Sequence, residues 1–216
     1  MMEIVNHPFI MQFFRSFKDD YNIYFLQEYI GGVELFDAIR DIGLLDTAQA
    51  QFYTASMILA IEHLHSLKVI YRDLKPENVM VDKEGYIKLI DMGTAKVLSK
   101  PGARTSTIIG TPHYMAPEIL AGKGYSFMID IWSIGICLFE FICGGLPFAE
   151  NAEDPFDVYD EIMKRGLTFP SFIKDKKSKR IISQMLNKNP EGRITGNYES
   201  LKAHQWFQSF NWVWLI

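Results

Sequence analysis

The stretch YRDLKPENVMVDKEGYIKLIDMG, residues 71–93, constrains the fold more than any other part of the sequence. It carries short apolar runs at 79–81 and 86–90 around the turn residues 82–85, which predicts a tight β-hairpin. Because a hairpin returns the chain to the end where it began, we expect Asp73, Asn78 and Asp91 to approach one another. The sequence thus predicts a polar cluster at one end of a small sheet.

This polar set suits a magnesium site that works with a phosphate group. Two carboxylates and one amide are too few ligands for a dedicated calcium site, but magnesium completes its shell with waters and phosphate oxygens. Lys75, two residues after Asp73, can place an ammonium against a transferring phosphoryl group. The alternative is a solvated hairpin end, since Asp, Asn, Lys and Pro are common turn residues. Taken one at a time, these residues favour that alternative.

The remainder of the chain predicts a small β part followed by a mostly helical part, an α+β fold. Two aromatic-rich runs, 11–17 and 23–29, flank a polar turn and predict a second hairpin. Helical spacing is found at 34–39, 47–67, around Glu118, and at 129–143, 156–165, 178–186 and 201–210, with Asp46 as the N-cap of the second helix. Residues 99–111 form a long polar loop of the kind that is usually functional or disordered.

Composition narrows the class of partner and the compartment. A chain of 216 residues with 26 acidic and 22 basic side chains has no excess of positive charge for nucleic acid or an anionic membrane, and a basic partner would suit it better. Cys137 and Cys143 lie six residues apart in a helical pattern, which predicts neither a disulfide nor a zinc site and favours a reducing, cytoplasmic location. Residues 128–148 are interrupted by charges, so we expect a buried helix and no membrane span. No secretory signal is predicted.

The order of the motifs adds a family resemblance. Asp-Leu-x-x-x-Asn is followed by Asp-x-Gly and then by Ala116-Pro117-Glu118, the order of the protein-kinase signature. The chain therefore resembles the later part of a eukaryotic Ser/Thr protein kinase domain over nearly its full length. The motifs YRDLKPEN, GTPHYMAPE, DIWSIGICLFEFICGGLPF and HQWFQSFNW resemble the basophilic, cyclic-nucleotide-dependent branch, and FNW with LIDMGTAK is most similar to cGMP-dependent protein kinase of a protist type.

The resemblance implies roles in phosphoryl transfer from ATP with magnesium. Asp73 would accept the proton of the substrate hydroxyl, Lys75 would stabilise the transferring phosphate, and Asn78 and Asp91 would hold magnesium. Tyr71 replaces a common histidine and Met92 a common phenylalanine, but both are apolar packing positions, so no required charge is lost.

The resemblance also implies nucleotide and substrate contacts. The nucleotide set is Gln27, Glu28, Ile30, Glu34, Met80 and Ile90, and the substrate set is Glu34, Glu77, Thr111 and Glu140. The glutamates would read basic residues before the target serine or threonine, which fits an acidic chain. Each glutamate could equally be a solvated helix residue, and the apolar nucleotide residues could be ordinary core.

Regulatory and structural residues follow from the same resemblance. Thr107 would be phosphorylated and paired with Arg72 and Lys96, the alternative being an unmodified threonine in a flexible loop. The structural positions are Glu118 paired with Arg193, and Asp130 bonded to the backbone of the catalytic loop.

Parts of the family pattern have no counterpart in this sequence. No glycine-rich phosphate loop and no Val-Ala-x-Lys strand precede the first hairpin. We therefore expect residues 1–30 to be a remnant of the small lobe (the end of a helix and two strands) and residues 31–216 to be the large lobe. The missing small lobe and a cyclic-nucleotide-binding region would belong to a longer parent chain. The rival hypothesis is a truncated kinase-like chain that acts as a non-catalytic binding module.

Overall fold

The predicted hairpin of residues 79–90 forms the centre of a three-stranded antiparallel sheet in the computed structural model, which describes residues 4–100, 102–194 and 197–215. Strand β5 (Val79–Asp82) pairs with β6 (Ile87–Leu89), and the register joins Val79 to Leu89. The Asp82 carboxylate closes the turn by accepting from the backbone N–H groups of Glu84 and Tyr86. The third strand, β3 (Gly32–Glu34), pairs with β5 and was not predicted, because its partner lies about fifty residues further along the chain.

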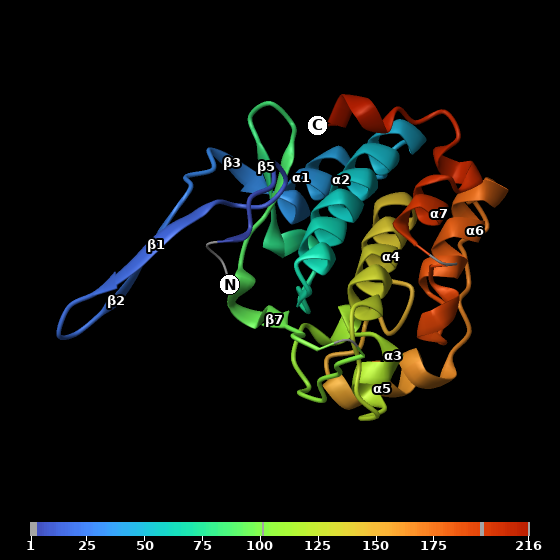
Figure 1. The fold of residues 1–216 in the computed structure, drawn as a ribbon. Coiled ribbons are helices and arrows are strands. Elements are labelled where there is room, and N and C mark those ends of the chain that lie inside the picture. Colours follow the sequence, from blue (N-terminus) through green and yellow to red (C-terminus); the bar gives the residue numbers. More distant parts are fainter. Residues whose placement is uncertain (1–3, 101, 195–196, 216) are drawn as a thin grey trace.

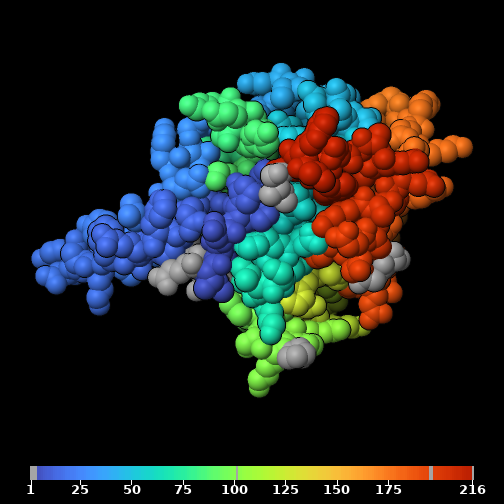
Figure 2. Space-filling view, turned by 45° about the horizontal axis from the view of Figure 1, so that its top comes forward, coloured from blue at the N-terminus to red at the C-terminus, as the bar shows by residue number. Residues whose placement is uncertain are grey.

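The N-terminal hairpin of β1 (Phe13–Lys18) and β2 (Ile23–Gln27) is confirmed, and it extends away from the body of the molecule (Figure 1). Asp19 holds its turn, because one carboxylate oxygen accepts from the backbone N–H groups of Tyr21 and Asn22. In the space-filling view the hairpin projects as a separate arm (Figure 2). Phe13, at its base, is buried, but most of the other apolar side chains of the arm are exposed.

Two long helices form the core of the body. Helix α2 (Thr47–Ser66) begins at Asp46 with a full capping box, since Asp46 and Gln49 each accept from the backbone of the other. Helix α4 (Met128–Cys143) packs beside it (Figure 1) and is buried along most of its length. No helix in the described residues is long and apolar enough to cross a membrane.

Shorter elements surround this pair. They are α1 (Leu35–Ile42), β4 (Val69–Ile70), β7 (Lys96–Val97), α3 (Pro117–Leu120), α5 (Pro155–Lys164), α6 (Lys176–Met185) and α7 (Tyr198–Lys202). Strands β4 and β7 pair with each other and were not predicted, because two-residue strands leave no alternation to detect.

The helix expected at residues 201–210 is wrong. Helix α7 ends at Lys202, and a separate 3₁₀ turn follows at Gln205–Phe207. His204 starts the new turn, because its Nδ1 atom accepts from the backbone N–H of Trp206 at 3.1 Å. The apolar periodicity of this stretch therefore reflects two short turns packed on one core.

This arrangement confirms an α+β fold, with strands gathered near the N-terminal part and helices beyond (Figure 1). The segment before β1 packs onto the body, since Phe9 and Ile10 are buried and the backbone N–H of Leu89 donates to the Phe9 carbonyl. The division at residue 30 stays a prediction. The end of a helix was expected within residues 1–10; residues 1–3 of this stretch lie outside the described residues, and residues 5–10 are not helical.

Candidate active site

The loop between β4 and β5 brings the predicted site residues Asp73, Lys75 and Asn78 together. Pro76 begins a 3₁₀ turn, Pro76–Asn78, which folds Asn78 back toward Asp73. The Asn78 amide donates to the backbone carbonyl of Asp73 at 2.8 Å and to its carboxylate oxygen Oδ2 at 3.0 Å. The Asp73 carboxylate is thereby fixed in orientation by a neighbour on its own loop.

Thr111, 38 residues further along, holds the other carboxylate oxygen. Its backbone N–H and its hydroxyl donate to Asp73 Oδ1 at 2.9 and 2.8 Å. Lys75 Nζ donates to the same hydroxyl at 2.8 Å and lies 3.9 Å from Asp73 Oδ2. A carboxylate, an ammonium and a hydroxyl therefore converge on one point. Gly110 allows this approach: its φ is +115°, and a Cβ atom there would lie 2.7 Å from the Arg72 carbonyl oxygen.

Asp91 lies at the end of β6, beside this group. The backbone N–H of Ile90 donates to the carbonyl of Asn78 at 3.0 Å, which ties the start of β5 to the end of β6. Asp91 has a left-handed backbone with φ of 38°, unusual for a residue other than glycine, and its carboxylate accepts from the Gly93 N–H at 2.9 Å. Its side chain is exposed to solvent.

The donor set fits magnesium in combination with phosphate oxygens. Because the nitrogen of the Asn78 amide faces Asp73, its oxygen is turned the other way and can face a cation. In the part of the chain that the structure describes, no three His, Cys, Asp or Glu side chains gather as a metal site, so these residues do not form a closed cage. Magnesium bound through one carboxylate, one amide and a substrate phosphate needs no such cage.

A cavity of about 550 Å³ opens between β2, its following segment and the ends of β5 and β6. The predicted nucleotide residues Gln27, Glu28, Ile30, Met80 and Ile90 all line it, together with Asp91. Glu34 is not among the residues that line it; it lies in β3, at the start of α1.

Sequence reasoning missed other residues of this cavity: Met11, Phe25, Tyr29, Met92 and Gly93. For Phe25, Tyr29, Met92 and Gly93, closeness to Gln27 or Asp91 in the sequence was the available signal. Met11 reaches the cavity through tertiary structure, since its backbone N–H donates to the Leu89 carbonyl at 2.9 Å. The Glu28 carboxylate pairs with Lys88 at 2.7 Å and accepts from the Gln12 N–H, so its side chain is already in use. The Glu28 backbone is therefore the part left to contact a base.

A second cavity, of about 620 Å³, brings together the predicted substrate residues Glu77, Thr111 and Glu140. The Tyr114 hydroxyl donates to Glu140 at 2.8 Å, and one Glu77 carboxylate oxygen is buried with no hydrogen-bond partner among the described residues. Burial raises the pKa of Glu140; the Tyr114 hydrogen bond opposes this rise, and the Glu77 carboxylate adds to it. Such a site favours a cationic ligand that would neutralise both carboxylates. Glu34 does not line this cavity either.

Sequence reasoning missed Tyr114 in this cavity, along with Arg40 on α1. The position of Tyr114 three residues after Thr111 was a usable signal. Arg40 stacks over the ring of Phe36, 4.2 Å from its centroid, and lowers the pKa of Glu140, against the effect of burial.

The predicted phosphorylation site lies on the long loop before α3. Thr107 is exposed, and its carbonyl accepts from the Tyr125 hydroxyl. Lys96 Nζ donates to the buried Thr105 hydroxyl at 2.9 Å, and Arg72 donates to the Thr94 carbonyl. In the described residues neither cation pairs with Thr107 itself, so their role toward a phosphate there stays a prediction.

Two sets of charged side chains in the interior support the site: Asp130, and the pair of Glu118 and Arg193. The Asp130 carboxylate accepts from the backbone N–H groups of Tyr71 and Arg72, each at 2.9 Å, and contacts His65 at 2.8 Å. It thereby holds Arg72 at a positive φ of 75°. Glu118 and the fully buried Arg193 form a two-bond pair at 2.6 and 2.7 Å.

The fold and this site define the class of protein. The sequence matches the family described as protein kinase domain over residues 1–207, and the chain belongs to this family. A cGMP-dependent protein kinase of Plasmodium berghei (strain Anka) is 49% identical over 210 residues, which cover 96% of this chain and 24% of the relative. The cGMP-dependent protein kinase of Toxoplasma gondii is 47% identical over 96% of this chain and 21% of its own length.

A human cAMP-dependent protein kinase catalytic subunit, PRKX, is 39% identical over 98% of this chain and 58% of its own length. The resemblance to the cyclic-nucleotide-dependent branch is therefore confirmed. The chain spans only about a quarter and a fifth of the two cGMP-dependent relatives.

Proposed function

We propose that this chain supplies the catalytic large lobe of a Ser/Thr protein kinase that transfers the γ-phosphate of ATP to proteins. The observation that carries the proposal is the convergence of Asp73, Lys75 and Thr111, with Asn78 fixed against Asp73. General-base and positioning groups need such hydrogen-bonded orientation before a substrate hydroxyl arrives.

In this proposal each residue has one task. Asp73 orients the substrate hydroxyl and takes its proton, while Lys75 stabilises charge on the transferring phosphoryl group. Asn78 and Asp91 hold magnesium, which supplies charge neutralisation of the phosphates when bound. The 550 Å³ cavity accepts the adenine base above Met80 and Ile90. The glycine-rich cover and its lysine would lie outside these 216 residues.

The substrate class that we propose is a basic segment around serine or threonine. The buried, unpartnered oxygen of Glu77 and the raised pKa of Glu140 indicate that neither carboxylate is paired with a cation in the described residues, although Arg40 also lines the cavity. Guanidinium groups pair with two carboxylates in a planar, two-bond geometry, so arginine fits better than lysine. The proposal also includes phosphorylation at Thr107 and regulation by a cyclic nucleotide, as in the names of the relatives. It further includes a cytoplasmic location, in keeping with the free thiols of Cys137 and Cys143.

The decisive experiment uses the full-length protein that contains this sequence. We expect Asp73→Asn to lower kcat for an arginine-containing peptide by about 10²- to 10⁴-fold, because the base is lost. The amide oxygen can still accept from Thr111, and the Asn78 amide keeps its bond to the backbone carbonyl of residue 73, so thermal unfolding should change little. Asp20→Asn, at the exposed tip of the first hairpin, is the matched control and should be fully active.

Normal turnover by Asp73→Asn would contradict the assignment. A purely non-catalytic binding module, the rival function, need not bind nucleotide. Magnesium-dependent ATP binding by the wild-type protein, lost in Asp91→Asn, would therefore favour the kinase over that rival.

A further inference from the structure

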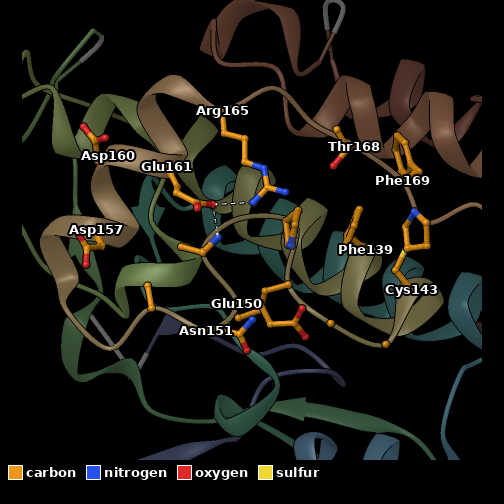
Figure 3. Close-up of a pocket in the computed structure, with 17 residues that line it drawn as sticks. Phe139, Cys143, Glu150, Asn151, Asp157, Asp160, Glu161, Arg165, Thr168 and Phe169 are labelled. Atoms are coloured by element: carbon orange, nitrogen blue, oxygen red, sulfur yellow. Dashed lines mark hydrogen bonds and ion pairs between the residues drawn. The ribbon is translucent and has the colours of Figure 1, made fainter.

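A third cavity, called the far cavity, lies away from the candidate active site, at the end of α4. It measures about 910 Å³ and is enclosed by the segment 144–152, helix α5 and the segment 168–170 (Figure 3). Figure 3 shows Phe139, Cys143 and Phe169 on one side and Asp157 and Asp160 on the other. The cavity thus has an apolar side and an acidic side.

The acidic side is only partly neutralised by the protein. Glu161 accepts from Arg165 at 2.9 Å, and Asp160 lies 2.5 Å from Lys164, which is not itself a lining residue. For Glu150 and Asp157 no ion pair is found within the described residues. On the apolar side, Lys179 stacks on Phe169, 5.5 Å from the ring centroid. Positive charge therefore lies beside the apolar side, and two carboxylates opposite it stay uncompensated.

This cavity adjoins the one that is lined by Glu77, Thr111 and Glu140. Both are lined by Gly144, Gly145, Leu146 and Glu150. The Glu150 carboxylate rests directly on Gly145, since a Cβ atom built there would lie 2.1 Å from its Oε1 atom. The two cavities therefore meet at Glu150 and the segment 144–146.

We propose that the far cavity is a docking site for a second segment of the protein substrate, one that carries a basic residue next to an apolar residue. The basic side chain would pair with Glu150 or Asp157, and the apolar one would pack against Phe169, which is half-buried beside the buried Phe139. This inference rests on the proposed kinase function. Charge complementarity and the lining shared with the substrate cavity select this occupant over a nucleotide or another anion, which the carboxylates would repel.

The test compares two peptides on the full-length protein. Both peptides contain the same arginines and phosphoacceptor serine. One is extended by a segment of arginine and leucine residues, and the other by a glycine–serine segment of equal length. Each extension is tested first N-terminal and then C-terminal to the shared sequence. We expect the basic–apolar extension on one side to lower KM about tenfold with kcat unchanged, because docking adds binding without touching the reaction. The double variant Glu150→Gln/Asp157→Asn should remove most of this KM ratio. Glu153→Gln, exposed in the same loop and outside the cavity, should keep it.

A KM ratio near one in the wild type, or an unchanged ratio in the double variant, would overturn the docking site while leaving the kinase function in place. If no peptide is phosphorylated, the proposed function has failed, and fluorescence anisotropy then reads docking directly. Tighter binding of the extended peptide that depends on Glu150 and Asp157 would still support the site, and equal binding of both peptides would refute it.

Discussion

At the scale of single residues, the site depends on buried charges that are fully partnered. Asp130 satisfies two backbone N–H groups of the catalytic loop, and Arg193 bonds Glu118 and the carbonyls of Asn187 and Met128. Leaving one member of such a set without its partner costs far more than the set contributes. These residues are therefore expected to act through stability and loop position, without touching the reacting atoms.

Glu118→Gln tests this at the most buried pair. The side chain of Arg193 is 0% exposed and that of Glu118 13%, so the substitution leaves a buried guanidinium uncompensated. We expect a loss of about 3 to 5 kcal/mol in the free energy of unfolding, measured by urea denaturation. Glu84→Gln breaks the exposed Lys83–Glu84 pair and should cost well under 1 kcal/mol. Equal losses in the two variants would show that burial does not set the cost.

At the scale of elements, the β1–β2 hairpin exposes apolar side chains and unpaired strand edges to solvent. Phe14, Phe17, Ile23 and Phe25 are all more than half exposed, and the outer edges of this two-stranded sheet are open. Exposed apolar strands with free edges promote pairing with another chain.

We therefore predict that the 216-residue chain self-associates as its concentration rises. Ile23→Lys/Phe25→Lys places two charges on one face of β2 and should shift the mass measured by light scattering toward the monomer. Gln208→Lys/Ser209→Lys adds the same charge at exposed positions far along the chain, and it should leave association unchanged. A wild-type chain that stays monomeric at every concentration would contradict the prediction.

At the scale of the whole molecule, the N-terminal segment and α2 meet at a pair of histidines that couples stability to pH. The rings of His7 and His63 stack with centroids 5.0 Å apart. Burial, aided by the nearby His63 and Lys88, lowers the pKa of His7 to about 4. In the unfolded chain the same group titrates near 6.5, so below that pH the unfolded state binds the additional proton.

The stabilising contribution of neutral His7 is thus complete above about pH 6.5 and is lost as the pH falls toward 4. Because the ring is only partly buried, we expect a loss on the order of 2 kcal/mol across this window, measured by thermal or urea unfolding. His7→Asn keeps an acceptor for the Phe9 N–H and cannot titrate, so its stability should fall less over the same range. An identical pH profile for both proteins would exclude His7 as the source.

Sequence patterns predicted the features that depend on neighbours along the chain. The turn at Asp82, the N-cap at Asp46 and the helix spacing of α2 and α4 follow from local hydrogen bonds and apolar periodicity, and they were predicted. The reciprocal bond from Gln49 that completes the capping box was not predicted. The order of the motifs that contain Asp73, Asn78 and Asp91 indicated the kinase family by resemblance. The hairpin between these motifs predicted that the three side chains approach one another. The break after Lys202 was missed, since a side-chain cap from His204 outweighed the apolar pattern.

Contacts between residues far apart in the sequence could not be predicted in this way. Thr111 donates to Asp73 across 38 residues, β4 pairs with β7, and Glu150 lines two cavities. None of these contacts is indicated by a periodic pattern in the sequence. Glu34 was placed with the nucleotide and substrate residues by resemblance, yet it lines neither cavity. The physical reason is that local sequence patterns reflect the preferences of turns and of the apolar faces of helices and strands. The approach of remote side chains depends instead on how those faces pack against one another.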